Sequence, residues 1–424
     1  MIYFVPSWYH QNEYKENEQY WFRRRMVTEF DDSVKQIQMF NRNEIMEYKI
    51  LNLSYSPNFR HFLHRQSVFH APYWSCFDAI QEIKRTKVDI LSYHDLMWPE
   101  HTEFIYTPFC ILAYVNNNKY AEVQFGEDGN MIEVNLFQQE VIVRKNIYDD
   151  RGFLSCTTIY DGNSPIYEQY LDEKGNWKMC RFINDGHIEV NPKNPYYLIN
   201  NQRIRMNSLS YPSVEMLIEE VSSIYLNEMT SKNDIFCLAM HTLHQNLLER
   251  LFLNKKTILS FYQNRLKLVD DDRLKNLIKN TNYCIVDSKS KIHEFEKYIG
   301  KRLPIVDITP FDTRVDFGIS QQLTVQNILV PIDMIEQSKL EALILVFMTY
   351  FEVNETARVH FFTRNANWNR VDSVLNFVQQ FLKTNGMDER LARKETNDKS
   401  EFDLDEENKV PIKFCEYPSV DPIQ

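Results

Sequence analysis

Glycine is scarce in this chain, which has nine among its 424 residues, and those few are clustered. Six of the nine lie between Gly126 and Gly186, while Gly300, Gly318 and Gly386 each stand alone. Enzymes that use nucleotide sugars seat the diphosphate on a glycine loop at a helix N-terminus, because a residue without a Cβ lets the backbone N–H approach the phosphate closely. The sequence offers no such loop, which argues against a phosphate site of that kind.

Long apolar runs and paired cysteines are also missing. No stretch reaches the ~20 apolar residues that span a bilayer, and the N-terminal segment Met1–Trp8 lacks the basic region of a signal peptide. The seven cysteines are scattered and include no C-x-x-C pair, which predicts reduced thiols in the cytoplasm and no zinc ribbon. The net charge of −11 argues against nucleic acid or an anionic membrane as the main partner.

Apolar runs alternate with amphipathic segments over most of the chain, whose length predicts two or three domains. This alternation is typical of parallel sheets covered by helices. We predict an α/β fold of two doubly wound, Rossmann-like domains facing each other across a cleft. Residues 1–103 and 196–270 form the two parts of the first domain, and residues 271–424 form the second.

The strands and helices of this prediction follow from the apolar pattern. Strands are predicted at 2–5, 48–53, 88–91, 234–239, 256–262, 282–286, 305–308, 328–330, 358–363 and 412–414. Helices are predicted at 30–37 (behind a capping box of Thr28 and Asp31), 58–66, 73–84, 245–252, from 288 onward, 338–350 and 371–384. Residues 387–409 are charged and poor in aromatics, and are predicted to be a mobile loop.

Residues 104–195 follow a different pattern, with polar and apolar residues alternating in short segments. Turn sequences such as Gly-Glu-Asp-Gly and Asp-Gly-Asn recur there at a spacing of roughly 8–12 residues. We predict an antiparallel β-meander inserted into the first domain. Its hairpin turns need residues with positive φ, so the clustered glycines have a structural explanation without a ligand.

Two pairs of histidines have a spacing that metal sites use. His61 and His64, and likewise His241 and His244, would lie on one face of a helix. Neither pair has a third ligand at a fixed spacing, so we interpret all four as structural histidines and predict no metal site.

Other isolated motifs are similarly weak. Ser7, Ser155 and Ser260 lie outside any G-x-S-x-G elbow, so a serine hydrolase is not supported. Arg23–Arg25 is shorter than the clusters of 4–8 basic residues that bind lipids, and we interpret it as a solvated turn, with an anion or lipid patch as the alternative.

Five aromatic residues are able to stack on sugar rings, but such residues serve cores and interfaces as often. We favour the core or interface role and keep glycan contact as the alternative. The five are Trp8, Tyr9, Trp21, Tyr73 and Trp74.

Several segments resemble two related families. Tyr148–Phe153 and Tyr170–Trp177 resemble the β-sheet insert of the GT-B glycosyltransferases that modify serine-rich repeat adhesins and wall teichoic acids. The chain as a whole is more similar to the family of the first accessory secretory protein of the accessory Sec system in Gram-positive bacteria. The segments that carry this second resemblance are Phe4–Trp8, Glu29–Asp32, Phe62–Gln66, Glu103–Phe109, Leu329–Asp333 and His360–Arg364.

This resemblance implies a non-catalytic member of the GT-B superfamily, without catalytic, cofactor-binding or metal-binding residues. It implies a cytoplasmic protein that works with other accessory secretory proteins and a dedicated SecA motor, and reaches the membrane only through the Sec machinery. Together they help to export a glycosylated serine-rich repeat adhesin, through protein binding and, as a further option, glycan binding. It also implies a further C-terminal stretch, so we expect the second domain to be incomplete in this chain.

The alternative is an active glycosyltransferase. Retaining enzymes of this type place a Gly-Arg pair and a downstream lysine on the donor diphosphate, and a glutamate near the sugar. Here Thr363 replaces the glycine, Arg364 matches the arginine, and Asn369 and Arg370 stand where the lysine is expected. Two guanidinium groups can bind phosphate, but the matching glutamate would fall after Gln424. We therefore expect no working donor site.

Overall fold

The computed structural model describes residues 1–10, 12–16, 18–23, 31–43, 46–268, 272–299, 304–308, 326–333, 335–363, 368–392 and 413–416. The chain forms two units, residues 1–312 and residues 313–424. The predicted start of a second domain at residue 271 is therefore wrong. The segment from 272 to 307 belongs to the first unit because its strands extend the sheet of that unit.

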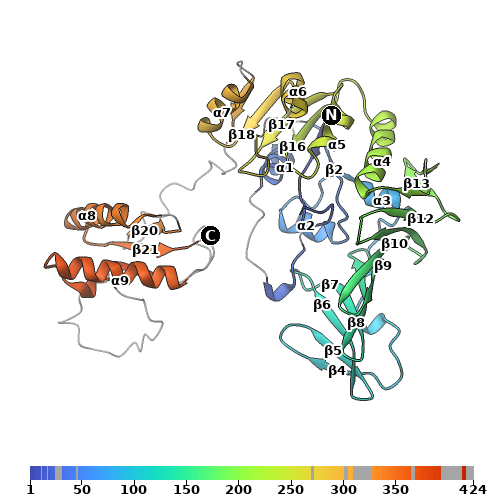
Figure 1. Cartoon of the computed structure of the whole chain (residues 1–424), viewed down its shortest axis with the longest axis horizontal. Coiled ribbons are helices and arrows are strands. Elements are labelled where there is room, and N and C mark those ends of the chain that lie inside the picture. Colours follow the sequence, from blue (N-terminus) through green and yellow to red (C-terminus); the bar gives the residue numbers. More distant parts are fainter. Residues whose placement is uncertain are drawn as a thin grey trace. The chain divides into compact units, whose positions relative to one another are not determined.

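A seven-stranded parallel sheet is the centre of the first unit (Figure 1). Its strand order is β19-β18-β17-β16-β1-β2-β3, so the chain runs outward from β1 in one direction and from β16 in the other. The predicted strands at the start of the chain and after residue 233 are confirmed. The bounds are β1 (Ile2–Val5), β2 (Tyr48–Asn52), β3 (Tyr73–Ser75), β16 (Ile235–Ala239), β17 (Lys256–Phe261), β18 (Tyr283–Val286) and β19 (Ile305–Asp307).

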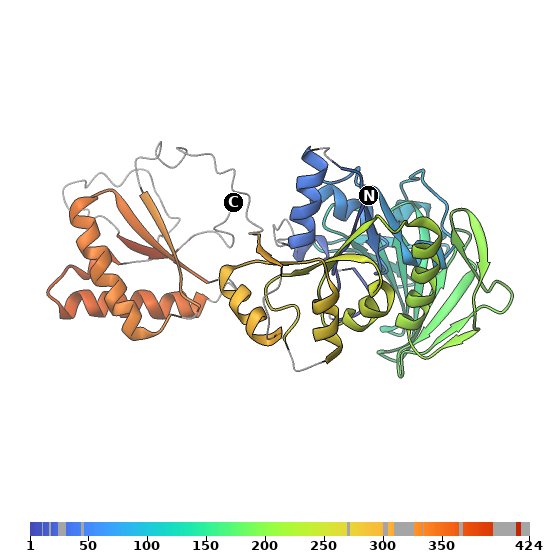
Figure 2. The same ribbon diagram turned by 90° about the horizontal axis from the view of Figure 1, so that it is seen from above.

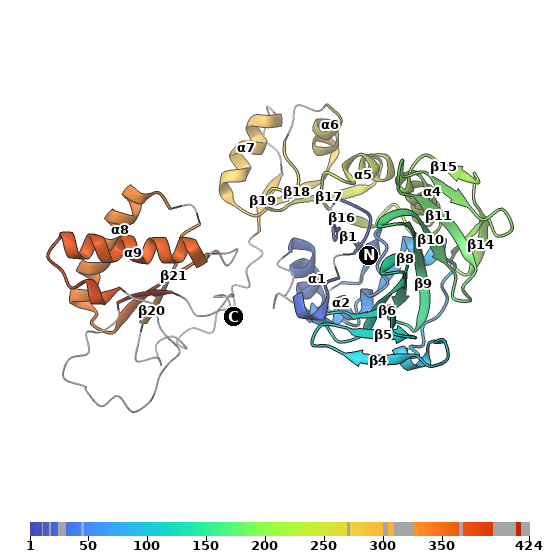
Figure 3. The ribbon, with the colours of Figure 1, turned by 60° about the horizontal axis from the view of Figure 1, so that its bottom comes forward.

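Helices cover both faces of this sheet, as Figure 3 shows. Right-handed crossovers place the helices that follow β1 and β2 on one face and those that follow β16, β17 and β18 on the other. The residues of β1 alternate accordingly: Phe4 packs in one apolar cluster with Ile37 of α1, and Val5 packs in the other with Leu247 of α5. The helices are α1 (Asp32–Asn43), α2 (Phe59–Arg65), α3 (Cys76–Ile80), α4 (Val214–Met229), α5 (Gln245–Phe252), α6 (Asp272–Asn280) and α7 (Lys289–Ile299).

The predicted β-meander is confirmed as a ten-stranded sheet in the order β15-β12-β11-β10-β9-β8-β7-β6-β5-β4, and each pairing in it is antiparallel. The central strands β6 to β10 have eight or nine residues each, and the sheet extends away from the parallel sheet (Figure 1). Its bounds are β4 (Glu103–Tyr106), β5 (Ile111–Val115), β6 (Asn118–Phe125), β7 (Met131–Gln138), β8 (Val141–Asp149), β9 (Phe153–Asp161), β10 (Ser164–Leu171), β11 (Trp177–Phe182), β12 (Ile188–Val190) and β15 (Ser210–Tyr211).

The insert ends later than predicted. A separate hairpin of β13 (Tyr196–Ile199) and β14 (Gln202–Arg205) precedes β15, which closes the ten-stranded sheet. The antiparallel region therefore continues to residue 211, and the predicted boundary at residue 195 is too early. The reason is that β15 pairs with β12 across an intervening hairpin, a long-range pairing that the local pattern does not contain.

Glycines occupy the hairpin turns as expected. Gly129, Gly162, Gly175 and Gly186 have φ between +59° and +82°, and a Cβ added to any of them would meet nothing within 4 Å. Gly152 differs, because its φ is +91° and an added Cβ would lie 1.7 Å from the carbonyl oxygen of Asp89. This glycine is required both by its backbone conformation and by a close approach of two chain segments.

The second unit has a three-stranded parallel sheet in the order β20-β21-β22. Its apolar core includes Val359 and Phe361 of β21, together with side chains from both helices. Figure 2 shows the helices and strands of this unit from above. The bounds are β20 (Gln326–Pro331), α8 (Gln337–Val353), β21 (Ala357–Phe362), α9 (Trp368–Thr384), η4 (Glu389–Leu391) and β22 (Phe414–Glu416).

Several local predictions are wrong. Residues 73–84 were predicted as one helix, but 73–75 form β3 because they pair in parallel with β2, and only 76–80 are helical. Residues 88–91 form no strand. The strand predicted at 412–414 is β22, two residues later. In the segment 387–409, residues 387–392 carry η4, and Ala392 is buried in the core, so that part is not a mobile loop. Residues 393–409 lie outside the described residues.

No helix in the described ranges combines the length and the apolarity that a bilayer crossing requires.

Candidate functional site

The carboxyl edge of the parallel sheet between β1 and β16 is the place where open α/β sheets bind ligands, because the strand order reverses there. The loops that follow β1, β16 and β17 meet at this edge. They bring together Ser7, Trp8 and Tyr9 after β1, His241 and His244 after β16, and Arg265 after β17.

Arg265 is the centre of a polar cluster at this edge. One guanidinium nitrogen donates to Asp31 Oδ2 and to Ser7 Oγ, each at 2.8 Å, and the other donates to Asp32 Oδ2 at 2.8 Å. Ser260 donates to the same Asp32 oxygen at 2.5 Å. Two of the three serines considered in the sequence are therefore engaged with charged groups.

Asp31 links this cluster to helix α1. Its Oδ1 accepts hydrogen bonds from the backbone N–H groups of Ser33 at 2.8 Å and Val34 at 3.2 Å, so it caps the helix. It also accepts a hydrogen bond from Trp8 Nε1 at 3.1 Å. The other half of the predicted capping box, Thr28, lies outside the described residues.

The cluster holds one guanidinium and two carboxylates, so its charge lies between zero and −1. Burial raises the pKa of Asp31 to about 6, with the neighbouring charge of Asp32 adding to the rise and Arg265 opposing it. Burial disfavours the charged form of Arg265, but the two carboxylates outweigh this and raise its pKa. A guanidinium that is already paired with two carboxylates is a poor receptor for a diphosphate, because the phosphate would meet a neutral or negative cluster.

His244 is fully buried and has both ring nitrogens engaged. Its Nδ1 lies 2.6 Å from the hydroxyl of Tyr9, and its Nε2 lies 2.7 Å from the carbonyl oxygen of Ala239. Burial lowers the pKa of His244 to about 3, so the ring is neutral at physiological pH. Nε2–H therefore donates to Ala239, and Nδ1 accepts the proton of the Tyr9 hydroxyl.

The predicted histidine pairs do not form metal sites in the part of the chain that the structure describes, where no three histidine, cysteine or acidic side chains converge. His244 precedes α5 as its N-cap residue, and His241 Nδ1 accepts a hydrogen bond from the backbone of Leu243 at 3.0 Å. His61 pairs with Asp128 at 3.2 Å, and the ring of His64 lies 5.9 Å from that of Phe69.

Of the five candidate sugar-stacking aromatics, Trp21 alone is exposed, with 43% of its surface accessible. Its Nε1 donates to the carbonyl oxygen of Phe109 at 3.1 Å. The other four pack against neighbouring rings inside the unit, with ring centroids 4.1–5.3 Å apart: Trp8 on Phe62, Tyr9 on Tyr14, Tyr73 on Phe59 and Trp74 on Tyr225.

The residues predicted at the donor position are only partly described. Thr363 follows β21 and is buried, and Arg364 lies outside the described residues. Asn369 and Arg370 belong to the first turn of α9, where Arg370 donates to the carbonyl oxygen of Ile335 at 2.9 Å. Of the arginine triplet, Arg23 ends the short helix η1 (Trp21–Arg23), and residues 24 and 25 are also outside.

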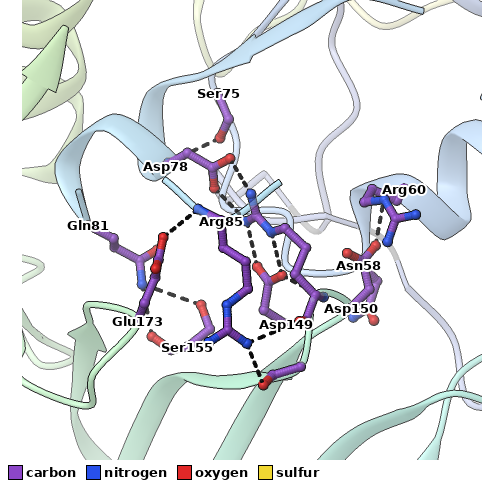
Figure 4. Close-up of polar contacts among 12 residues, drawn as sticks. Asn58, Arg60, Ser75, Asp78, Gln81, Arg85, Asp149, Asp150, Ser155 and Glu173 are labelled. Atoms are coloured by element: carbon purple, nitrogen blue, oxygen red, sulfur yellow. Dashed lines mark hydrogen bonds and ion pairs between the residues drawn. The ribbon is translucent and has the colours of Figure 1, made fainter. Parts of the chain in front are cut away.

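A second polar network joins the parallel-sheet region to the insert, and the sequence analysis missed it (Figure 4). Arg151, in the turn between β8 and β9, binds both carboxylate oxygens of Asp78 in α3, each at 2.8 Å. The same guanidinium binds both oxygens of Asp149, each at 2.7 Å. Arg151 and Asp149 are both buried, so this is an ion-pair network inside the protein.

Neighbouring residues extend this junction (Figure 4). The carboxylate of Asp150 accepts hydrogen bonds from the backbone N–H groups of Arg60 at 2.9 Å and His61 at 3.4 Å, at the start of α2. Gln81 Nε2 donates to the backbone carbonyl of Ser155 at 2.9 Å, so the third candidate serine also lies at the junction. The only sequence signal was the run Asp149–Gly152 in a predicted hairpin turn, which brings two acidic residues next to an arginine.

Comparison with known proteins identifies the family. Residues 1–420 match the family described as accessory Sec system protein 1. The chain belongs to this family. The resemblance found in the sequence is therefore confirmed over nearly its whole length.

One member of the accessory Sec system protein 1 family, from Streptococcus gordonii, is 30% identical over 347 residues. The match covers 79% of this chain and 63% of that relative, so the chain spans less than two thirds of its length. The chain is also similar to the crystal structure of accessory secretory protein 1, 2 and 3 in Streptococcus pneumoniae, with a TM-score of 0.76 and 26% identity, covering 90% of this chain and 76% of the other.

The fold of this family member is that of a GT-B glycosyltransferase. The pneumococcal O-GlcNAc transferase GtfA, in complex with UDP and GlcNAc, aligns with a TM-score of 0.58 at 11% identity, over 91% of this chain and 74% of that enzyme. At this identity the likeness concerns the fold alone, and it confirms the predicted fold class. The predicted cleft between two domains stays a prediction.

Proposed function

We propose that this chain is a non-catalytic component of the accessory Sec system, which acts by binding the other accessory secretory proteins. Membership of the accessory Sec system protein 1 family over residues 1–420 is the observation that carries the proposal. The similar pneumococcal structure contains accessory secretory proteins 1, 2 and 3, and this supports proteins 2 and 3 as partners here. We extend the proposal to the SecA motor and to a glycosylated serine-rich repeat adhesin as the exported cargo, and we place the protein in the cytoplasm.

The chemistry of the sheet edge supports a non-catalytic role. At the sheet edge of the first unit, this chain presents Trp8 and Tyr9 after β1 and a guanidinium that is already paired with two carboxylates. The buried His244 is held neutral by its surroundings, and both of its nitrogens are engaged. Neither His244 nor Arg265 is therefore free to transfer a proton or to bind a phosphate at this edge.

The second candidate function is an active glycosyltransferase, which the fold likeness to GtfA favours. A thermal-shift measurement with uridine-diphosphate sugars separates the two. A donor present at 100 times its Kd would stabilise the protein by about 2.7 kcal/mol. We expect no shift, and a saturable shift together with sugar transfer would favour the enzyme.

The partner proposal is tested with the purified full chain and the accessory secretory proteins 2 and 3 of the same organism. We expect co-elution in gel filtration and a complex that survives dilution to micromolar concentration. Deleting the gene should block surface display of the adhesin and leave bulk secretion intact. Normal display in the deletion strain, or no complex at any concentration reached, would contradict the proposal.

A further inference from the structure

Helix α8 in the second unit is apolar on its outer side as well as on its inner side. Its inner side contributes Leu340, Ile344 and Phe351 to the core. A surface helix normally turns charged and polar residues toward the solvent. Here Val346 and Val353 lie on the opposite side, with 65% and 86% of their surfaces exposed.

Four exposed apolar residues and one threonine form one stripe along the helix. Ala342, Leu345, Val346, Thr349 and Val353 follow the three- and four-residue spacing that places side chains on one face, and all five are exposed. We call these five residues the α8 stripe. From its first to its last residue it spans about 16 Å at the rise of an α-helix. A continuous exposed apolar stripe of this kind marks an interaction surface.

The charges beside the α8 stripe define what can cover it. At 100° per residue, Glu341 and Glu352 lie on the same flank, next to Leu345, and both are exposed. Among the residues that the structure describes, neither carboxylate has an ion-pair partner. Lys339 lies on the other flank and is 3.6 Å from Glu336. The stripe thus has one acidic flank with two unpaired charges about 16 Å apart.

This charge pattern disfavours a second copy of the chain. In an antiparallel two-fold pair the same flanks face each other, so Glu341 and Glu352 of one copy would lie against Glu352 and Glu341 of the other. In a parallel pair Lys339 could reach Glu341 of the partner copy, but Glu352 would still lack a basic partner. Like charges placed opposite each other suppress association.

We infer that the α8 stripe binds an amphipathic helix of a partner protein, whose apolar face covers Val346 and whose flank carries two basic residues opposite Glu341 and Glu352. Helix docking on an apolar stripe with flanking charges is an established mode of recognition. The inference rests on the proposed function, because that function supplies the partners: accessory secretory proteins 2 and 3.

The test measures binding of the full chain to purified accessory secretory proteins 2 and 3. Val346→Lys keeps helix propensity but places a cation against the apolar face of the partner helix, close to its basic flank. This variant should weaken binding at least about tenfold. Met97→Lys is the matched control, because Met97 is 100% exposed outside the α8 stripe, and it should bind as the parent does. Glu341→Lys with Glu352→Lys should also weaken binding and remove its sensitivity to salt.

The outcomes separate this inference from the proposed function. If the parent chain does not bind at all, the proposed function fails. If the parent binds and Val346→Lys binds equally well, the inference alone is wrong. A parent that dimerises while Val346→Lys stays monomeric would assign the stripe to a second copy. A fall of several degrees in the melting temperature of unbound Val346→Lys would mean that the stripe is covered within the chain. Each of these last two results would overturn the inference.

Discussion

Replacing Arg151 by methionine should destabilise the first unit strongly while leaving its shape almost unchanged. Methionine fills a similar volume but removes the guanidinium that binds Asp78 and Asp149. The side chain of Asp149 is only 3% exposed, so its carboxylate would be left charged and unpaired inside the protein. Breaking a buried ion pair from one side costs about 3–5 kcal/mol.

This cost converts into a measurable melting shift. Unfolding entropy is about 2.1 cal/mol/K per residue near the melting temperature, so a unit of 312 residues loses about 0.65 kcal/mol of stability per degree. The expected fall for Arg151→Met is therefore about 5–8 °C by calorimetry. Arg144→Met is the matched control, because Arg144 is exposed on the neighbouring strand β8, and it should change the melting temperature by less than about 1 °C.

A second variant tests the mechanism itself. Asp149→Asn combined with Arg151→Met removes the stranded charge, so the double variant should recover part of the loss. Burial already raises the pKa of Asp149, and without Arg151 that pKa should rise further. The deficit of Arg151→Met should therefore shrink on going from pH 8 to pH 5, as Asp149 takes up a proton. Equal melting temperatures for Arg151→Met and Arg144→Met would refute the reasoning.

Three further predictions concern single positions. Gly152→Ala should destabilise far more than Gly162→Ala, measured as chemical-denaturation midpoints, because its Cβ would lie 1.7 Å from the Asp89 carbonyl whereas that of Gly162 meets nothing; similar midpoints would contradict the close approach. Burial lowers the pKa of His244 to about 3, below the value near 6.5 in the unfolded chain. Neutral His244 therefore contributes stability above pH 6.5 that is lost as pH falls toward 3, by up to about 1.4 kcal/mol per unit, and His244→Asn should show a flatter melting profile over this range. Burial raises the pKa of Asp150 to about 7, so its contribution is present at pH 4 and lost as pH rises through 7. Asp150→Asn should gain stability relative to the parent from pH 4 to pH 8, and a constant difference would show that Asp150 does not titrate there.

Much of the fold could be predicted from the sequence because its signals are local. The run of β16 is apolar over the length of a buried strand, and the helix predicted at 245–252 is α5, residue for residue. Glycines at hairpin spacing predicted the insert because a positive φ is a property of one residue and its immediate neighbours. The family resemblance was carried by short segments, and the match over residues 1–420 confirmed it.

The candidate site could not be predicted, because its contacts join residues that are far apart in sequence. Tyr9 meets His244 across 235 positions, and Asp31 meets Arg265 across 234. Neither local sequence shows that the ring of His244 is uncharged or that two carboxylates offset the charge of Arg265. Both facts depend on burial and on the charge of a distant neighbour.

Pairing between segments that are far apart in sequence also explains the errors at the ends of strands and helices. Tyr73–Ser75 is too short for its own pattern to distinguish a strand from a helix, and it is extended because β2 offers it a parallel partner. Strands β18 and β19 belong to the first unit because β18 pairs with β17 and β19 pairs with β18. By itself the sequence determined which segments are apolar, where the chain turns and to which family it belongs. The tertiary structure decided which segments pair and which charges are buried together, because pairing and burial are set by the whole fold and not by any one segment.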